Sequence, residues 1–209
     1  MPSWALAAVV AVGATHVVAW LADRRALAAV TKAIPILLLA VLAWTTGGAY
    51  ARLVAAGLAC SAVGDVCLLS EERFVPGLAS FLVGHCFYLA AFAGTGPGLV
   101  PDWRWGIVLA LLSGGLLAVL WGALPAALRG PVTVYVGVIA AMAFAATSRA
   151  ATPGTPAPSG VLAATGALWF LASDAILALD RFVRPLPRAH AWVMLTYYAA
   201  QTCIAASVA

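Results

Sequence analysis

The feature that most constrains this chain is a succession of eight apolar segments with short connections between them. Each segment is close to the length at which a helix crosses about 30 Å of hydrocarbon, allowing for tilt. Only helices or closed barrels can span a bilayer, and these runs are continuous rather than alternating, so they predict helices. The approximate limits are 3–22, 30–46, 50–69, 75–93, 104–122, 131–147, 160–179 and 190–208.

The composition agrees with an all-α integral membrane protein. Charged residues make up 9% of the chain, against about 25% in soluble domains, and the mean hydropathy is +1.05. The net charge of +4 does not predict nucleic acid as a partner, because the basic residues are scattered through short loops without interleaved aromatics. We expect one transmembrane domain over residues 1–209, with the lipid bilayer around it.

The first segment carries its charges after the apolar run rather than before it, which is the reverse of a secretory signal peptide. It is therefore interpreted as the first transmembrane helix. The four cysteines all lie in apolar runs without the CxxC spacing of a metal site. Small buried packing residues are the simplest interpretation of these four: Cys60, Cys67, Cys86 and Cys203.

The basic residues predict the orientation in the membrane. Eight spans place both termini on one side, which holds three basic residues: Arg52, Arg104 and Arg149. The opposite side, called the basic side below, holds eight: Arg24, Arg25, Lys32, Arg73, Arg129, Arg181, Arg184 and Arg188. Positively charged loops stay in the cytoplasm. We therefore expect a cytoplasmic basic side, with both termini outside, in a bacterial cell membrane.

Two carboxylates, Asp65 and Asp174, lie inside apolar segments near their basic-side ends. At about 1.5 Å per residue they are roughly 6–8 Å deep. Gly57 and Ser61 precede Asp65 at four-residue spacing, a small-residue face that lets another helix approach. Ionisable residues at this depth are candidates for function. The alternative is an Asp that only holds helices together through hydrogen bonds.

Other polar side chains, with Met194 in line with those of the last segment, collect in the same half, and His85 and Tyr88 are expected nearer the midplane; the outer half is predicted to be nearly all apolar. Lys32 is expected at the mouth of the basic side. The further members of this polar set are His16, His85, Tyr88, Tyr135, His190, Met194, Tyr197 and Gln201. Their uneven distribution predicts a cavity that opens to the basic-side interface.

A faint internal repeat relates the two aspartates. The stretches "GDVCLLSEERF" and "SDAILALDRF" each place an Asp shortly before a Phe, and at the same offset Tyr88 falls on Tyr197. Two four-helix halves running in the same direction would form a parallel repeat, with its pseudo-twofold axis along the membrane normal. Such a repeat would bring Asp65 and Asp174 towards one axis.

Two carboxylates in an apolar site tend to differ in protonation, so that one donates a proton and the other accepts one. That pair is suited to general acid–base hydrolysis with a water molecule and without a metal. Together with the three histidines the aspartates could also bind zinc. However, the sequence has no HxxxH or HExxH spacing, and His16, His85 and His190 lie on different segments.

Taken together, the stretches "TKAIPILLLA", "SAVGDVCLL", "FLVGHCFYLAA", "PVTVYVGVIAAMAF", "GALWFLASDAILALDRF" and "TYYAAQTCIA" resemble the YhhN-like family of lysoplasmalogenases over nearly the whole chain. The resemblance implies hydrolysis of the vinyl-ether bond of lysoplasmalogens to a fatty aldehyde and a glycerophospho-alcohol, without a cofactor. It implies that Asp65 and Asp174 are the catalytic pair and leaves open which one is the acid. The substrate-binding positions that we expect are Lys32, His85, Tyr88, Tyr135, Arg181, Tyr197 and Gln201. Asp180 departs from the family pattern, in which Asn is commoner.

The implied mechanism places the phosphate of the substrate near Lys32, Arg73 or Arg181 and its alkenyl tail in the apolar outer half. One Asp would protonate the β-carbon of the vinyl ether. The other, ionised, would stabilise the oxocarbenium ion and activate water, as the two carboxylates of a glycosidase do.

Two other functions stay open. A proton-coupled lipid or small-molecule transporter would share buried carboxylates and repeats, but the outer half offers no obvious polar path and no obvious broken helix. A zinc-dependent, ceramidase-like lipid hydrolase is the second. Product analysis would separate the transporter from the hydrolase, and metal analysis would separate the two hydrolases. The sequence does not predict an oligomeric state.

Overall fold

The computed structural model describes residues 3–96 and 98–209, and every regular element within these ranges is a helix. The elements in chain order are α1 (Ser3–Leu21), α2 (Arg25–Lys32), α3 (Ile34–Thr46), α4 (Gly48–Cys67), η1 (Glu71–Arg73), α5 (Phe74–Gly94), α6 (Trp103–Trp121), α7 (Ala126–Ala151), α8 (Ala157–Ala178), the π-helical turn η2 (Leu179–Val183) and α9 (Ala189–Ala206). The predicted all-α membrane bundle is confirmed.

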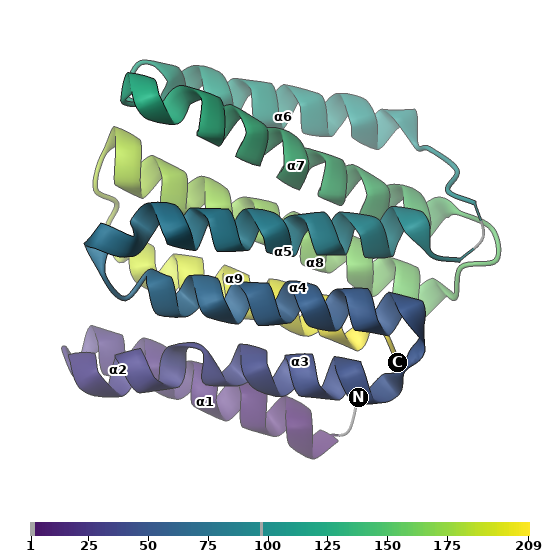
Figure 1. Cartoon of the computed structure of the whole chain (residues 1–209), viewed down its shortest axis with the longest axis horizontal. Coiled ribbons are helices and arrows are strands. Elements are labelled where there is room, and N and C mark those ends of the chain that lie inside the picture. The colour runs from purple at the N-terminus through teal and green to yellow at the C-terminus, as the bar shows by residue number, and fades with distance from the viewer. Residues whose placement is uncertain (1–2, 97) are drawn as a thin grey trace.

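Eight passes account for this bundle. Seven helical stretches of the described residues are long and apolar enough to span a membrane, with α2 and α3 counted as one stretch. The eighth pass is α9, which is more polar and runs along α8 (Figure 1). Its polar side chains are tolerated because neighbouring helices, rather than lipid, cover them. Both termini lie at the same end of the bundle (Figure 1), as an even number of passes requires.

Two of the predicted segments have different limits in the structure. The second pass begins at Arg25 and is broken at Ala33, although no obvious broken helix was expected. Pro35 explains the break, because its ring lacks an N–H and clashes with the preceding turn. The sixth pass extends over Ala126–Ala151, so Pro131 lies inside α7 rather than at its start. Hydropathy marks only the part of a helix inside the hydrocarbon, and α7 continues beyond it at both ends.

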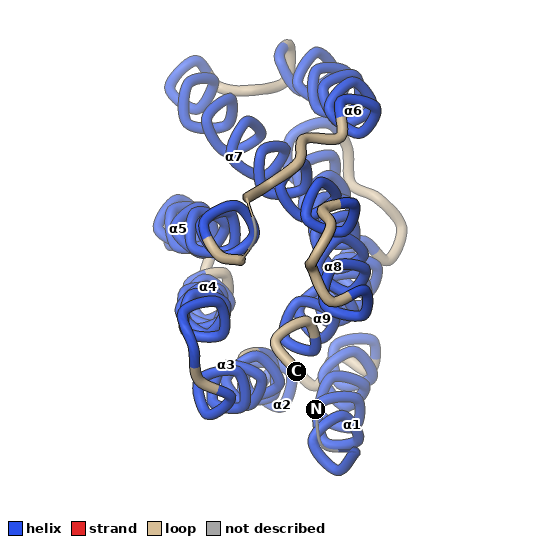
Figure 2. The backbone as a smooth tube through the Cα atoms, turned by 90° about the vertical axis from the view of Figure 1, so that its right-hand side faces the viewer, coloured by secondary structure: helices blue, strands red, loops and turns tan. Residues whose placement is uncertain are grey.

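Six helices surround the middle of the bundle, in the order α3, α4, α5, α7, α8, α9 and back to α3. Outside them, α1 packs on α2, α3 and α9, and α6 packs mainly on α7 (Figure 2). The pair α4–α5 corresponds to α8–α9, α3–α4 to α7–α8, and α5–α7 to α9–α3. This is the packing order that the parallel repeat predicts.

Close helix approach in both halves depends on glycine. A Cβ on Gly57 would lie 2.3 Å from the Tyr88 ring, and one on Gly166 would lie 2.8 Å from the carbonyl oxygen of Ala200. The predicted small-residue face of α4 therefore packs against protein, with Ser61 and Asp65 also buried.

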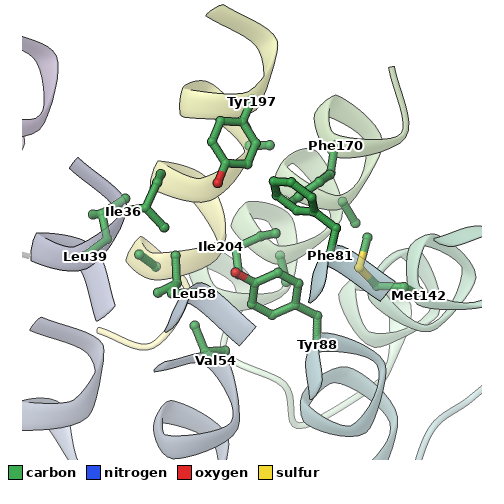
Figure 3. Packing of buried hydrophobic residues seen from close by; sticks show 14 of the residues in the cluster. Ile36, Leu39, Val54, Leu58, Phe81, Tyr88, Met142, Phe170, Tyr197 and Ile204 are labelled. Carbon is green, nitrogen blue, oxygen red and sulfur yellow. The ribbon is translucent and has the colours of Figure 1, made fainter. Parts of the chain in front are cut away.

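The centre of the bundle is filled with side chains below the basic-side ends of the helices. Tyr88, Phe170 and Tyr197 come from three helices and point towards one another (Figure 3). The rings of Phe170 and Tyr197 meet edge to face, with centroids 5.5 Å apart. Aliphatic side chains complete the packing in Figure 3: Ile36, Leu39, Val54, Leu58, Met142 and Ile204.

The outer half is not nearly all apolar, so that prediction was wrong. Arg149 is 7% exposed, donates to the carbonyl of Thr95 at 2.7 Å and stacks on the ring of Tyr50. The Tyr50 hydroxyl is 2.7 Å from Ser207 Oγ, and Ser159 donates to the Ser207 carbonyl at 2.6 Å. These polar groups bind carbonyls left free at the ends of α5 and α9, a role that hydropathy does not reveal.

The four cysteines are also less buried than predicted. Cys60, Cys67 and Cys203 are partly exposed, and Cys86 is exposed. Lipid tails are as apolar as a protein core. An apolar run in a membrane protein therefore does not distinguish a residue facing protein from one facing lipid.

Candidate active site

A cavity of about 570 Å³ opens among the basic-side ends of the helices, and both predicted catalytic aspartates line it. Asp65 reaches it from α4 and Asp174 from α8. The wall also includes residues of α1, α2, α5, η2 and α9. The structure therefore brings together two carboxylates from the two halves of the chain, at the end where the sequence predicted a cavity.

Asp65 is held by a lysine and a tyrosine. The Tyr197 hydroxyl donates to Asp65 Oδ2 at 2.7 Å. Lys32 Nζ lies 3.8 Å from Oδ1 and donates to the Asp65 carbonyl at 3.2 Å. The Asp65 side chain is 2% exposed and that of Lys32 is 7% exposed. A buried ammonium beside a buried carboxylate favours the ionised form of both groups.

Lys32 is therefore not the open mouth residue that the sequence predicted. It is the last residue of α2, where the second pass breaks. The Tyr198 hydroxyl donates to the Lys32 carbonyl at 2.8 Å, which satisfies an acceptor that the break leaves without its helical partner. The break lets the Lys32 side chain turn into the bundle towards Asp65, and an estimate of depth along a straight helix misses this turn.

Asp174 has a tyrosine but no lysine or arginine beside it among the described residues. The Tyr135 hydroxyl donates to Asp174 Oδ2 at 2.5 Å. His85 Nε2 lies 3.9 Å from the same oxygen, beyond hydrogen-bond distance. At 17% exposure, the Asp174 side chain is more accessible from the cavity than that of Asp65.

Three predicted substrate-binding residues lie behind the cavity rather than in its wall. The Tyr88 hydroxyl donates to Gln201 Oε1 at 2.6 Å, and both residues are fully buried. His85 is also fully buried, with its ring edge-on to Phe170 at a centroid distance of 4.5 Å. None of these three residues is in the wall of the cavity. That they bind the substrate stays a prediction.

Arg181 and Tyr197 do line the cavity. Arg181 lies at its rim on η2, with its side chain 42% exposed and Nη1 3.9 Å from Glu71 Oε2. Its guanidinium also covers the ring of Phe74 at 5.0 Å. A π-helical turn within a helix often marks a functional site, and here it places Arg181 over the opening.

Sequence reasoning missed a histidine pair in the same wall. His16 Nδ1 lies 2.8 Å from the Ala28 carbonyl, which only accepts, so Nδ1 carries the proton. In the neutral ring, Nε2 of His16 then accepts from His190 Nε2, 3.0 Å away. Trp20 stacks on His190 at 3.6 Å, and Arg25 covers Trp20 at 4.0 Å. Both histidines were in the polar set, but only the tertiary structure pairs α1 with α9.

A second, apolar pocket of about 170 Å³ also has Asp174 in its wall. It lies between α5, α6, α7 and α8, and Tyr135 is in its wall. The two pockets share Phe74, Asp174 and Leu177. No sequence signal separates the residues of this pocket from ordinary lipid-facing or packing residues.

Within the described residues, no group of three or more His, Cys, Asp or Glu side chains is arranged as a metal-binding cluster. The histidines are divided between two places, with His85 near Asp174 and the His16–His190 pair on the opposite wall. Each of the two carboxylates in the cavity wall accepts a hydrogen bond from a tyrosine hydroxyl, and carboxyl groups can donate or accept protons.

A family model described as the YhhN family matches residues 27–208. The chain belongs to the YhhN family. The match begins in α2 and includes both aspartates, Lys32 and the whole of α9, so it covers nearly every residue of the candidate site.

Several mammalian proteins are similar to this chain in sequence. The chain is 37% identical to human "Lysoplasmalogenase TMEM86B" over 184 residues, which is 86% of this chain and 74% of that protein. The pig protein of the same name is 38% identical over 203 residues, or 93% of this chain and 82% of its own length. Human "Lysoplasmalogenase TMEM86A" is 41% identical over 155 residues, 72% of this chain and 62% of that protein. No solved structure matches this chain.

Proposed function

We propose that this YhhN protein hydrolyses the vinyl-ether bond of lysoplasmalogens, giving a fatty aldehyde and a glycerophospho-alcohol. One observation carries the proposal: Asp65 and Asp174 line the same cavity, and each accepts a hydrogen bond from a tyrosine. The names of the relatives, lysoplasmalogenases at 37–41% identity, supply the substrate class.

The two carboxylates have different surroundings, and these support different roles. The Lys32 ammonium beside Asp65 favours a carboxylate that accepts protons and stabilises positive charge. Asp174 has no such cation in the described structure and is the more exposed of the two. It also lies where the polar cavity meets the apolar pocket. We therefore assign Asp174 as the acid and Asp65 as the base.

In the first step the Asp174 carboxyl donates its proton to the β-carbon of the vinyl ether. The C=C electron pair forms the new C–H bond, and the α-carbon becomes part of an oxocarbenium ion. The Asp65 carboxylate stabilises this cation, as a nearby negative charge does in glycoside hydrolysis. Asp65 then takes a proton from a water molecule as the water oxygen bonds to the α-carbon, which gives a hemiacetal.

In the second step the hemiacetal collapses and both acids return to their starting states. Asp65, now protonated, gives its proton to the glycerol oxygen as the C–O bond breaks. Asp174, now ionised, takes the proton of the hemiacetal hydroxyl as the aldehyde C=O forms. The hydrogen bonds from Tyr135 and Tyr197 hold the two carboxyl groups in place throughout. Such positioning contributes to catalysis by keeping reacting groups in line.

The phosphate of the substrate would lie at the rim of the cavity near Arg181 and Arg25, both of which line it. Guanidinium groups form strong charge-assisted hydrogen bonds with phosphate. Lys32 is buried against Asp65, so we assign it a role beside that catalytic carboxylate rather than in binding the headgroup.

The protein is an integral, multi-pass membrane protein. We propose further that the cavity opens to the cytoplasm in a bacterial cell membrane, with both termini outside. Burial of Arg149 against the Thr95 carbonyl supports this orientation, because that arginine is held by the protein rather than exposed in a loop. The difference in exposed positive charge between the basic side and the outer side is therefore larger than the counts of basic residues indicate.

A proton-coupled transporter remains the second candidate, and the broken α2–α3 pass favours it, since transporter sites are commonly built on broken helices. The two functions differ in product and in the need for a second compartment. Purified protein in detergent micelles should be incubated with a panel of lysolipids carrying vinyl-ether, alkyl-ether or ester chains. Release of aldehyde from the vinyl-ether lipid alone supports hydrolysis; no product from any member, with uptake into proteoliposomes, supports transport.

A further inference from the structure

The apolar pocket between α5, α6, α7 and α8 has no role in the mechanism above, although it ends at the proposed acid. We infer that this pocket holds the part of the alkenyl chain next to the vinyl ether, which enters sideways from the bilayer and is positioned so that the vinyl-ether carbons meet Asp174. The inference rests on the proposed function and adds to it the site that recognises the chain.

The lining of the pocket matches a hydrocarbon chain. Leu112 and Leu116 of α6 face Val132, Val136 and Ile139 of α7. The few polar side chains in the wall are at or near its catalytic end or bear only a hydroxyl: Ser113, Tyr135 and Asp174. A polar ligand would lose its hydrogen bonds to water in such a pocket, whereas an alkyl chain has none to lose.

The residues shared by the two pockets indicate how a lysolipid would lie. Phe74, Asp174 and Leu177 belong to both walls, so the Asp174 carboxyl group lies at the boundary between the polar cavity and the apolar pocket. A molecule with a charged head in one and a chain in the other crosses this junction at the bond between them. In a lysoplasmalogen that bond is the vinyl ether.

The rim of the junction carries groups suited to both parts of the substrate. Phe74 and Phe182 meet edge to face with their centroids 5.9 Å apart. Arg181 directly precedes Phe182 in the chain, and its guanidinium lies over the ring of Phe74. The aromatic pair thus lies between the Arg181 guanidinium and the apolar pocket.

The sequence predicted that the chain would run straight into the outer half, and the structure opposes this. The middle of the bundle is filled by Tyr88, Phe170 and their neighbours (Figure 3), and the outer half contains the buried Arg149. The lateral route is less obstructed, because α6 lies at the edge of the bundle against α7 (Figure 2) and Leu112 is 56% exposed.

Transfer of a chain from lipid into this pocket gains little hydrophobic free energy, because lipid is equally apolar. The pocket would therefore contribute little to the affinity for the substrate. Its role would be to determine which carbons of the chain lie beside Asp174. A side chain that fills the pocket should push a long chain out of register. It should leave a chain too short to reach the obstruction unaffected.

The test compares Val136→Phe with Val134→Phe. Both are the same substitution on α7, but Val136 lines the pocket and is 9% exposed, whereas Val134 is 56% exposed and outside it. Hydrolysis of a hexadecenyl and a propenyl lysoplasmalogen gives a ratio of kcat/KM values for each variant. For Val136→Phe this ratio should fall by about tenfold or more, since a misplacement of about 1 Å can cost as much as a hundredfold in rate. Val134→Phe should keep the wild-type ratio.

An unchanged ratio in Val136→Phe, or the same change in both variants, would overturn the inference. A second measurement covers a Val136→Phe protein that does not fold. Wild-type protein is irradiated with a lysophospholipid that carries a diazirine at the end of its chain. We expect labelling at Leu112, Leu116 and Val136, and labelling confined to Ile36 and Leu39 in the opposite half of the core would contradict the pocket. Because labelling needs no turnover, its result is separate from that of the hydrolysis assay.

Discussion

Replacement of Lys32 by methionine tests the catalytic pairing most selectively. Methionine keeps an unbranched side chain of similar length and removes the ammonium 3.8 Å from Asp65 Oδ1. With an effective dielectric constant of about 20, Coulomb's law gives about 4 kcal/mol for two unit charges at that separation. Removing one partner of a buried pair typically destabilises a protein by about 3–5 kcal/mol, because the other charge is left unpaired.

Asp65 can avoid this penalty by taking up a proton, and it then loses the charge that the mechanism requires. We therefore expect kcat of Lys32→Met to fall by about 10²–10⁴-fold, the range for loss of a general acid–base group. KM should change little, because Lys32 does not contact the headgroup in this account. The assay is steady-state aldehyde release in detergent, with thermal unfolding of the same preparation followed by tryptophan fluorescence.

The control is the double variant Lys32→Met with Asp65→Asn. It removes both charges, so it should regain thermal stability relative to Lys32→Met and remain inactive. A rise in KM with unchanged kcat in Lys32→Met would show that the lysine binds a phosphate present in ground and transition states alike. That result would refute the pairing and restore the headgroup role predicted from the sequence.

Two further predictions follow from single contacts and a third from the proposed orientation. Tyr135→Phe removes the hydroxyl that donates to Asp174 at 2.5 Å, so kcat should fall by about tenfold with little change in melting temperature; equal loss of both would indicate a structural hydroxyl only. Gly57→Ala places a Cβ 2.3 Å from the Tyr88 ring and should destabilise the bundle by about 1–3 kcal/mol, whereas Gly115→Ala, with no neighbour within 4 Å, should not; similar melting temperatures for the two variants would count against this packing. A C-terminal tag should be labelled from outside intact cells, and labelling only after the membrane is opened would reverse the proposed orientation.

The sequence was most informative where one physical variable decided the structure. Transfer of backbone groups into hydrocarbon requires helices, so apolar runs predicted the passes. Depth along a helix follows from residue number, so Asp65 and Asp174 were expected at the same end, and both line the cavity there.

Other features depended on rotation about helix axes, which residue number does not reveal. The apposition of His16 and His190, and the turn of Lys32 towards Asp65, require knowledge of which helices are neighbours. Arg149 was counted as a loop charge because its carbonyl partner lies on another helix. The apolar pocket was invisible for a different reason, since leucine and valine are equally suited to packing, to lipid contact and to binding a chain.

The most direct test of the central claim is aldehyde release by wild type, Asp65→Asn, Asp174→Asn and the double variant in detergent. Asn keeps the size of Asp but neither donates a carboxyl proton nor carries its charge, so packing is preserved while acid–base chemistry is lost. Each single variant should elute as a folded protein with activity below about a tenth of wild type, and Asp65→Asn should melt at a lower temperature than Asp174→Asn because it leaves the buried Lys32 ammonium unpaired. The double variant should be little worse than either, because residues that act as a unit are strongly non-additive. A folded single variant that retains more than about a tenth of wild-type activity would contradict the assignment of Asp65 and Asp174 as an acid–base pair.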